Sequence, residues 1–132
     1  MSGKDRMADE GEQEYLSQYH PEDYASISIT VDAIVVGVAK NSTDNYRKLD
    51  RQSLKILLVK REHYPYKGYY GLPGGFVGTK ETFEDTLKRV LSDKTGLLDV
   101  YSEQLYTFGS VDRDPRMRIV SCAYISLVDI SK

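Results

Sequence analysis

The sequence predicts an α+β domain in which a sheet packs against one helix. Four runs of apolar and β-branched residues have the composition of strands, at residues 27–38, 54–59, 100–111 and 117–128. Between the second and third runs, one segment instead repeats its apolar residues at helical spacing. The resulting order is two strands, a short extended stretch, a helix and two more strands. A chain of 132 residues suits one such domain with a single modest core.

Composition narrows the class of protein. The net charge of −2 gives no overall attraction to nucleic acid, so a basic site would have to be a local patch. Cys122 is the only cysteine, which excludes an intrachain disulfide and fits a reducing compartment. No apolar run reaches the roughly 18 residues of a membrane span, and the acidic N-terminus lacks the apolar region of a signal peptide. We therefore expect a cytoplasmic protein without a membrane partner.

The N-terminal part is expected to be separate from the folded domain. Residues 1–23 predict a flexible acidic segment and residues 24–132 the domain itself. Residues 1–13 are polar and show no periodicity, which is typical of disorder. One short helical turn is expected before Pro21, formed by Tyr15, Leu16 and Tyr19.

The first two strands are separated by a polar stretch. The first strand starts with alternating Ser and Thr and then becomes apolar on both faces, so its later half should be buried on both sides. Asp32 lies within this strand, where it faces either a ligand or solvent, because an unpaired buried carboxylate would be costly. Residues 40–53 are polar and predict a loop before the second strand.

The helix is the best specified element. A Pro- and Gly-rich stretch, residues 65–75, leaves room for only a few extended residues before it. Thr82 and Asp85 have the spacing of an N-terminal capping pair, and Gly96 fits the C-cap of a helix that ends near Thr95. The last two strands are then joined by a charged turn that contains Pro115.

Residues 74–97 carry a recognisable pattern. It is a Gly, five residues, Glu, seven residues, Arg, and then an aliphatic, a Gly and a second aliphatic residue, at Gly75, Glu81, Arg89, Leu91, Gly96 and Leu97. This pattern resembles the signature of the Nudix hydrolase superfamily, and the resemblance covers roughly residues 26–128. It implies an αβα sandwich with a mixed sheet. Because the chain stops just after a strand, we expect it to lack the final helix of that sandwich and to be the N-terminal part of a longer protein.

Three signature positions depart from the family. Active Nudix enzymes have glutamates there that bind Mg²⁺ or Mn²⁺ and help to activate water, whereas this chain has Val90, Asp93 and Lys94. Divalent hard cations prefer several carboxylate oxygens, and Lys94 would repel one. We therefore expect no catalytic residue, no required cofactor and no metal site, with Asp93 as a weak candidate ligand. Val90 is interpreted as core. Lys94 either extends its charge to water or contacts a ligand phosphate in the metal's place.

Two further segments point to one branch of the superfamily. Residues 60–77 and 112–124 are similar to segments of the Nudix-related transcriptional regulators of NAD metabolism and their ADP-ribose pyrophosphatase-like relatives. In those regulators an often degenerate Nudix domain binds ADP-ribose, and a C-terminal winged helix-turn-helix binds DNA. Consecutive glycines allow close backbone approach to phosphate, and three guanidiniums near one turn suit phosphate recognition, although a charged hairpin tip is equally ordinary. The candidate ligand-binding residues are Arg61, Gly74, Gly75, Asp93, Lys94, Arg113, Arg116 and Arg118.

Three hypotheses follow. The first is a ligand-sensing domain of a transcriptional regulator that binds ADP-ribose or a related nucleoside diphosphate derivative, such as a nucleotide-sugar, with weak or no hydrolysis. It is expected to be a homodimer and to contact DNA only through a domain outside this chain. The second is an active pyrophosphatase that uses Mg²⁺ or Mn²⁺ and recruits carboxylates from among Glu81, Glu84, Asp93 and Glu103. The third is a protein-interaction module with an apolar dimer surface.

Overall fold

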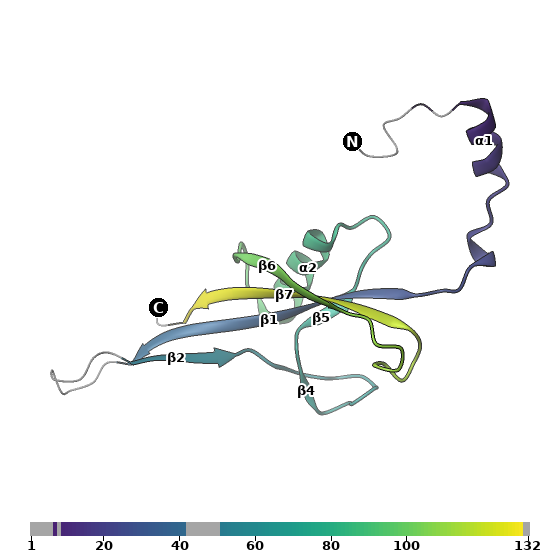
Figure 1. Ribbon diagram of the computed structural model, residues 1–132. Helices are drawn as coiled ribbons and strands as arrows, with labels where there is room; N and C mark the ends of the chain where they lie inside the picture. The colour runs from purple at the N-terminus through teal and green to yellow at the C-terminus, as the bar shows by residue number, and fades with distance from the viewer. Residues whose placement is uncertain (1–6, 8, 42–50, 131–132) are drawn as a thin grey trace.

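A computed structural model describes residue 7 and residues 9–41 and 51–130. Its centre is a five-stranded sheet with the order β2-β1-β7-β6, to which β5 adds by pairing with β1 (Figure 1). The strands of this sheet are β1 (Ser28–Asn41), β2 (Arg51–Ile56), β5 (Gly74–Phe76), β6 (Ser102–Phe108) and β7 (Ile119–Asp129). β1 and β7 run parallel, whereas the other pairs are antiparallel. The predicted α+β class with a mixed sheet is confirmed.

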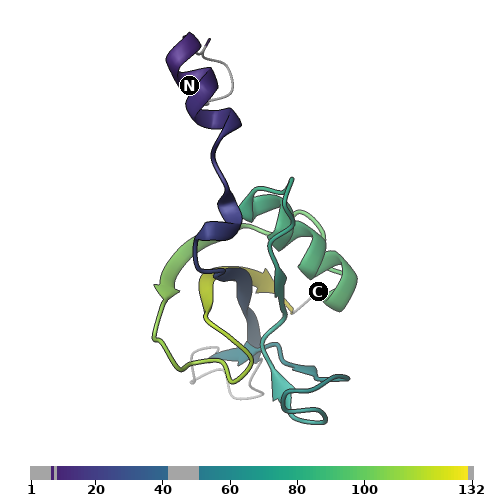
Figure 2. The ribbon, with the colours of Figure 1, turned by 90° about the vertical axis from the view of Figure 1, so that its right-hand side faces the viewer.

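A second, two-stranded sheet forms a hairpin beside the first. It consists of β3 (Val59–Lys60) and β4 (Tyr70–Gly71), and Figure 2 shows it projecting from the body of the domain. The sequence predicted one strand over 54–59, which the structure divides between the two sheets. The division occurs after Leu57. Its backbone N–H donates to Val35 O at 3.0 Å and so still contacts the central sheet, and the chain then turns away.

Helix α2 (Phe83–Thr95) has both of the predicted caps. Thr82 Oγ1 accepts from Asp85 N at 3.0 Å, and Asp85 Oδ2 accepts from Thr82 N at 3.1 Å, which satisfies two otherwise unpaired amides. Gly96 ends the helix with φ of 74°, a left-handed conformation that favours glycine. The helix is therefore set by local sequence at both ends.

The core lies between α2 and one face of the sheet. Leu87 and Leu91 from the helix meet Val31, Ala33, Val35, Cys122 and Tyr124 from β1 and β7. Cys122 is a buried free thiol, as expected for core. Figure 1 shows α2 on this side of the sheet, seen nearly edge-on. The apolar stripe of the helix thus packs as its spacing predicts.

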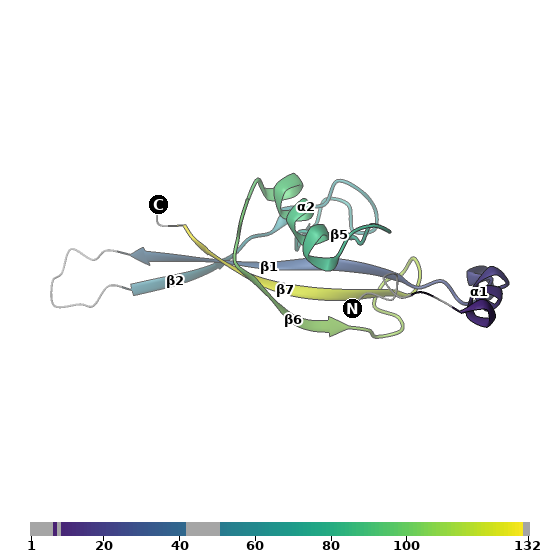
Figure 3. The ribbon, with the colours of Figure 1, turned by 90° about the horizontal axis from the view of Figure 1, so that it is seen from above.

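The opposite face of the sheet exposes apolar side chains. Val36 of β1 pairs with Ile56 of β2 and with Leu127 of β7, so the three lie in a row across the sheet. Ile56 and Leu127 are each more than half exposed. Helix α1 (Glu10–Ser17) does not cover them, because it stands apart beyond the start of β1 (Figures 1 and 3).

Several boundaries differ from the sequence prediction. Helix α1 begins at Glu10, earlier than expected, because Asp9 Oδ1 accepts from Glu12 N at 2.8 Å and caps it. The expected loop over 40–53 begins and ends in strand, and its residues 42–50 lie outside the described part, as do residues 1–6 and 8 of the tail. β6 is shorter than the predicted 100–111 and contains a bulge between Gln104 and Tyr106. No described helix is both long and apolar enough to span a bilayer.

Candidate functional site at the signature loop

β5 brings the two signature glycines against β1 and α2. The register pairs Gly74 with Asp32 and Gly75 with Val31. A Cβ on Gly74 would lie 2.0 Å from Asp32 Oδ1, and one on Gly75 would lie 3.0 Å from Val90 Cγ2. Contacts within the protein therefore leave no room for a Cβ at either position. Close approach of a phosphate to these two glycines stays a prediction.

Asp32 belongs to a small polar cluster under Gly74. Its Oδ2 accepts from Thr30 Oγ1 at 2.9 Å and also from Ser121 Oγ. The sequence left two alternatives, a carboxylate facing a ligand and one facing solvent. The structure shows a third arrangement. Hydroxyl groups within the sheet donate to the carboxylate and offset the cost of removing it from water, and the carboxylate lies against the backbone of Gly74.

Glu81 fastens the signature loop to helix α2. Its Oε1 accepts from Gly78 N at 2.9 Å, from Thr86 Oγ1 at 3.1 Å and from Arg89 Nη2 at 3.0 Å. Its Oε2 accepts from Arg89 Nε at 2.8 Å, which completes a bidentate pair. The hydrogen bonds from Arg89 are the main reason that the pKa of Glu81 is lowered to about 2. The carboxylate is thus ionised and fully engaged by protein donors.

Two cations meet the outer edge of β5. Ala33 N donates to Pro73 O, and Val77 N donates to Ile29 O. The backbone polar groups of residues 73, 75 and 77 therefore point to β1, and those of residues 74 and 76 point away from it. On that outer edge Lys94 Nζ donates to Gly74 O, and Arg89 Nη2 donates to Phe76 O at 2.9 Å. The backbone N–H groups of Gly74 and Phe76 point to this same edge, because a strand residue directs both of its polar groups to one side.

Val90 and Asp93 complete this end of the helix. Val90 is 1% exposed beneath Gly75, so its interpretation as core is confirmed. Asp93 is exposed and makes no hydrogen bond within the described part of the chain. Of the two alternatives for Lys94, the structure places its ammonium at the loop carbonyl and leaves two of its three donors for other partners.

The donor chemistry at this point does not fit a divalent cation. Across the described ranges, no three His, Cys, Asp or Glu side chains lie close enough together to hold a metal ion. Both oxygens of Glu81 are engaged by Arg89, the Gly74 carbonyl receives an ammonium, and Val90 offers no ligand. Hard cations require several available oxygens, whereas this edge presents N–H donors and positive charge. It suits an anion.

The other carboxylates considered for hydrolysis lie elsewhere. Glu84 projects from the opposite flank of α2, where its Oε1 accepts from Tyr124 Oη at 3.3 Å. Glu103 on β6 accepts from Tyr101 Oη. Asp93, the remaining candidate, precedes Lys94 directly, and its charge adds to the hydrogen bond with Glu81 in raising the pKa of Arg89.

The loop after β6 places one arginine beside the signature. Arg116 is held by Asp114 through three hydrogen bonds of 2.9–3.0 Å, which lower the pKa of Asp114 to about 2. The guanidinium carbon of Arg116 lies 5.3 Å from the centre of the Phe76 ring, a cation–π contact. Because Phe76 follows Gly75 directly, this contact brings Arg116 to the site.

The remaining predicted arginines brace loops. Arg61 Nε donates to Pro65 O at 2.7 Å within the β3–β4 hairpin. Arg113 Nη1 donates to Ile119 O at 3.1 Å, and Arg118 Nη2 donates to Gly109 O at 2.9 Å. The Nε of Arg118 is buried and lacks a hydrogen-bond partner among the described residues. The structure therefore brings together Gly74, Gly75, Asp93, Lys94 and Arg116, but does not gather the other three around them.

Sequence reasoning missed two contributors. Arg89 was recognised as a position of the signature, yet its guanidinium pairs with Glu81 and reaches Phe76 O. Its place in the signature, eight residues after Glu81, was the available signal. Phe76 was not considered, and nothing in its sequence context indicates the arginine stacked on it.

Comparison with known proteins gives a consistent result. The family model of the NUDIX domain matches residues 42–131. The ADPR responsive transcriptional repressor NtrR of Acinetobacter baylyi is 37% identical over 120 residues, which cover 89% of this chain and 44% of that protein. The ADP-ribose pyrophosphatase of Methanocaldococcus jannaschii is 44% identical over 71 residues, which cover 54% of this chain and 42% of that protein. The chain thus spans less than half the length of either relative.

A solved structure agrees over most of the chain. The NUDIX domain of Shewanella oneidensis NrtR complexed with ADP ribose shares 36% identity and a TM-score of 0.73, covering 89% of this chain and 71% of that one. The shared fold, the signature spacing and the match of the family model to more than half of the residues lead to one conclusion. The chain belongs to the Nudix family.

Proposed function

We propose that this Nudix domain binds ADP-ribose or a related nucleoside diphosphate derivative, with weak or no hydrolysis, as the ligand sensor of a transcriptional regulator. The observation that carries the proposal is the contact of Lys94 Nζ with Gly74 O at the signature loop. It puts a fixed positive charge where a metal-dependent enzyme needs a cation bound by carboxylates.

The pyrophosphate is the part of the ligand that this edge of β5 suits. Lys94 has two further donors, and the N–H groups of Gly74 and Phe76 lie on the same edge. The side chain of Arg89 is 44% exposed, so its charge acts on the same space even though Glu81 holds it. Charge-assisted hydrogen bonds of this kind are stronger than neutral ones and need no metal.

The relatives support the choice of ligand. The Acinetobacter protein is named as an ADPR responsive repressor, and the Shewanella domain was solved with ADP ribose. Both are more than a third identical to this chain over 89% of its length. We also propose that DNA binding in the whole protein lies outside these 132 residues, since the 120 aligned residues cover 44% of the repressor. The homodimer stays a prediction.

Calorimetric titration of the folded protein with ADP-ribose tests the proposal. We expect binding of similar affinity in Mg²⁺ and in EDTA. We also expect that chromatography of the mixture afterwards recovers the ADP-ribose without hydrolysis. Absence of binding by protein that shows a cooperative thermal transition would overturn it.

Hydrolysis of ADP-ribose with Mg²⁺ or Mn²⁺ is the alternative, and the name of the Methanocaldococcus relative favours it. On this account Asp93 is the carboxylate to test, because it is exposed beside Lys94, whereas Glu81 is engaged and Glu84 lies on the other flank. Turnover that requires metal and is abolished in Asp93→Asn would establish the enzyme. A flat assay with either metal would support the sensor.

A further inference from the structure

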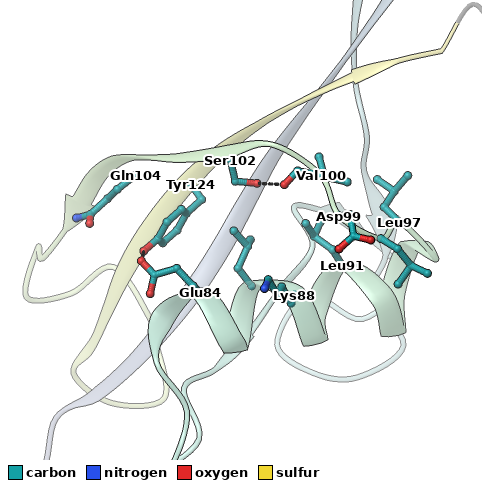
Figure 4. Close-up of a pocket in the computed structure, with 11 residues that line it drawn as sticks. Glu84, Lys88, Leu91, Leu97, Asp99, Val100, Ser102, Gln104 and Tyr124 are labelled. Atoms are coloured by element: carbon teal, nitrogen blue, oxygen red, sulfur yellow. Dashed lines mark hydrogen bonds between the residues drawn. The ribbon is translucent and has the colours of Figure 1, made fainter.

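A cavity of about 370 Å³ lies on the flank of α2 that faces away from the signature loop. Leu87 and Leu91 of the helix form one apolar wall, and Leu97 and Val100 form part of another. Strands β6 and β7 close the far side through Gln104 and Tyr124 (Figure 4). The size falls in the range of small-molecule sites, roughly 300–1,000 Å³.

Helix α2 separates this cavity from the anion edge of β5. Successive helical residues point about 100° apart, so Glu84, Lys88 and Leu91 share one flank and Arg89 and Val90 turn to another, whereas Lys94 lies in the last turn of the helix, about two turns beyond Leu87. The first group lines the cavity, whereas the second group and Lys94 touch Gly74, Gly75 and Phe76. A ligand in the cavity would therefore not compete for the groups assigned to a pyrophosphate.

The polar groups around the cavity carry excess negative charge. Two carboxylates, Glu84 and Asp99, and one ammonium, Lys88, line it. None of the three forms an ion pair within 4.0 Å among the described residues, and Asp99 makes no hydrogen bond there either. Unpaired carboxylates beside apolar walls attract cations and hydrogen-bond donors and repel phosphates and carboxylates.

Tyr124 fixes the carboxylate of Glu84 at the cavity. Its ring is 4% exposed, and its hydroxyl donates to Glu84 Oε1 at 3.3 Å. Burial, with the charge of Glu84 adding to it, raises the pKa of Tyr124 to about 12. The hydroxyl thus remains a neutral donor at ordinary pH, and Glu84 Oε2 has no partner in the described structure and can accept from a ligand.

We propose that this cavity is a second binding site, for a compact aromatic or aliphatic molecule with a positively charged amine or a strong hydrogen-bond donor. The apolar part packs on Leu87, Leu91 and Val100, and the head group reaches the carboxylate of Glu84. The preference is opposite in sign to that of the signature loop. The same helix therefore carries a site for cations on one flank and one for anions on the other.

Three probes with the same ring test the assignment. Tryptamine, indole and indole-3-acetate present a cationic, a neutral and an anionic version of one two-ring body. In a titration followed by amide chemical shifts of the protein, tryptamine is expected to bind on the order of tenfold more tightly than indole-3-acetate, with indole between them. The shifts should centre on residues 84–91 and 97–104 and on Tyr124.

Two variants separate the site from general charge attraction. Glu84→Gln should lower the affinity for tryptamine to that for indole and leave indole unchanged. Glu103→Gln removes the same charge from an exposed position of β6 outside the cavity and should change neither. Leu98→Trp, at the exposed rim, should weaken all three probes without disturbing the core.

Three results would overturn the proposal. One is the absence of shifts with any probe at millimolar concentration, which is also the result expected if another segment or a second copy fills the cavity in solution. Another is an equal effect of Glu84→Gln and Glu103→Gln. The third is a set of shifts centred on Gly74, Phe76 and Lys94. None of these results bears on ADP-ribose binding, so the two proposals fail separately.

Discussion

The Glu81 carboxylate accepts hydrogen bonds from three separate places, the backbone of the signature loop, the first turn of α2 and Arg89. The signature pattern has a glutamate at this position, and here its hydrogen bonds join the loop to the helix. An acid group that is held ionised by its neighbours links their stability to pH.

We expect acid to loosen this anchor in a defined window. The pKa of Glu81 is lowered from 4.5 to about 2, mainly by Arg89, so the ionised form is favoured in the folded protein. The stabilisation is fully present above pH 4.5 and is lost as pH falls toward 2. Thermal melting over this range should fall less steeply for Glu81→Gln than for the unchanged protein. Glu62→Gln, at an exposed site, should keep the full slope, and an unchanged slope in Glu81→Gln would contradict the account.

Tyr124 makes the opposite link at alkaline pH. Burial raises its pKa from 10.0 to about 12, so the neutral phenol is favoured in the folded protein. This contribution is fully present below pH 10 and is lost as pH rises toward 12. Denaturant unfolding should therefore show a smaller fall in stability across this window for Tyr124→Phe. Tyr64→Phe, in the exposed hairpin, serves as the matched control and should behave like the unchanged protein.

At the scale of elements, β5 and α2 fit each other through one close contact. Gly75 leaves room for Val90, which is buried where a metal-binding enzyme of this family has a glutamate. Val90 therefore packs against Gly75 at the place where that glutamate would supply a metal ligand.

Gly75→Ala measures the tightness of that contact. Its Cβ would lie 3.0 Å from Val90 Cγ2, so we expect a loss of about 1–3 kcal/mol in the free energy of unfolding. Val90→Ala makes space, and the double variant should be more stable than the sum of the two losses predicts. Gly109→Ala, where a Cβ would have no neighbour within 4 Å, should change stability by less than about 0.5 kcal/mol. Strict additivity in urea unfolding would show that the two residues do not compete for space.

Elements set by local chemistry were predictable, and those set by distant contacts were not. The caps of α2 depend on Thr82, Asp85 and Gly96 alone, and all three were recognised from spacing. The division of 54–59 between two sheets depends on which distant strand each half pairs with, β1 or β4, and no local pattern records that.

The same distinction holds for the site. Gly74, Gly75 and Lys94 could be proposed from the sequence because they lie in or directly beside the signature, which fixes their spacing along a loop and a helix, and their role in binding stays a prediction. The arginines were grouped by nearness in sequence, but each guanidinium bonds to the partner that the fold offers it, so only Arg116 reaches Phe76. Side-chain direction in a loop is a tertiary property, and composition does not predict it.

At the scale of the whole molecule, the domain keeps the Nudix scaffold and changes the charge of its signature site. Val90 and Lys94, whose ammonium contacts Gly74 O, stand in place of two of the three carboxylates that would hold a metal, so binding of a diphosphate should be independent of divalent cations. The flank of α2 that faces away from the signature loop lines the cavity for which we propose a preference for cations. The expected homodimer and the expected DNA contact stay predictions.

Calorimetric titration of ADP-ribose into three proteins, each in Mg²⁺ and in EDTA, tests the central claim most directly. The unchanged protein should bind equally well in both buffers. Lys94→Gln should lose about tenfold or more in affinity, and Lys88→Gln, which removes the same charge from the other flank of α2, should bind normally. Binding that requires Mg²⁺ and survives Lys94→Gln would contradict the account.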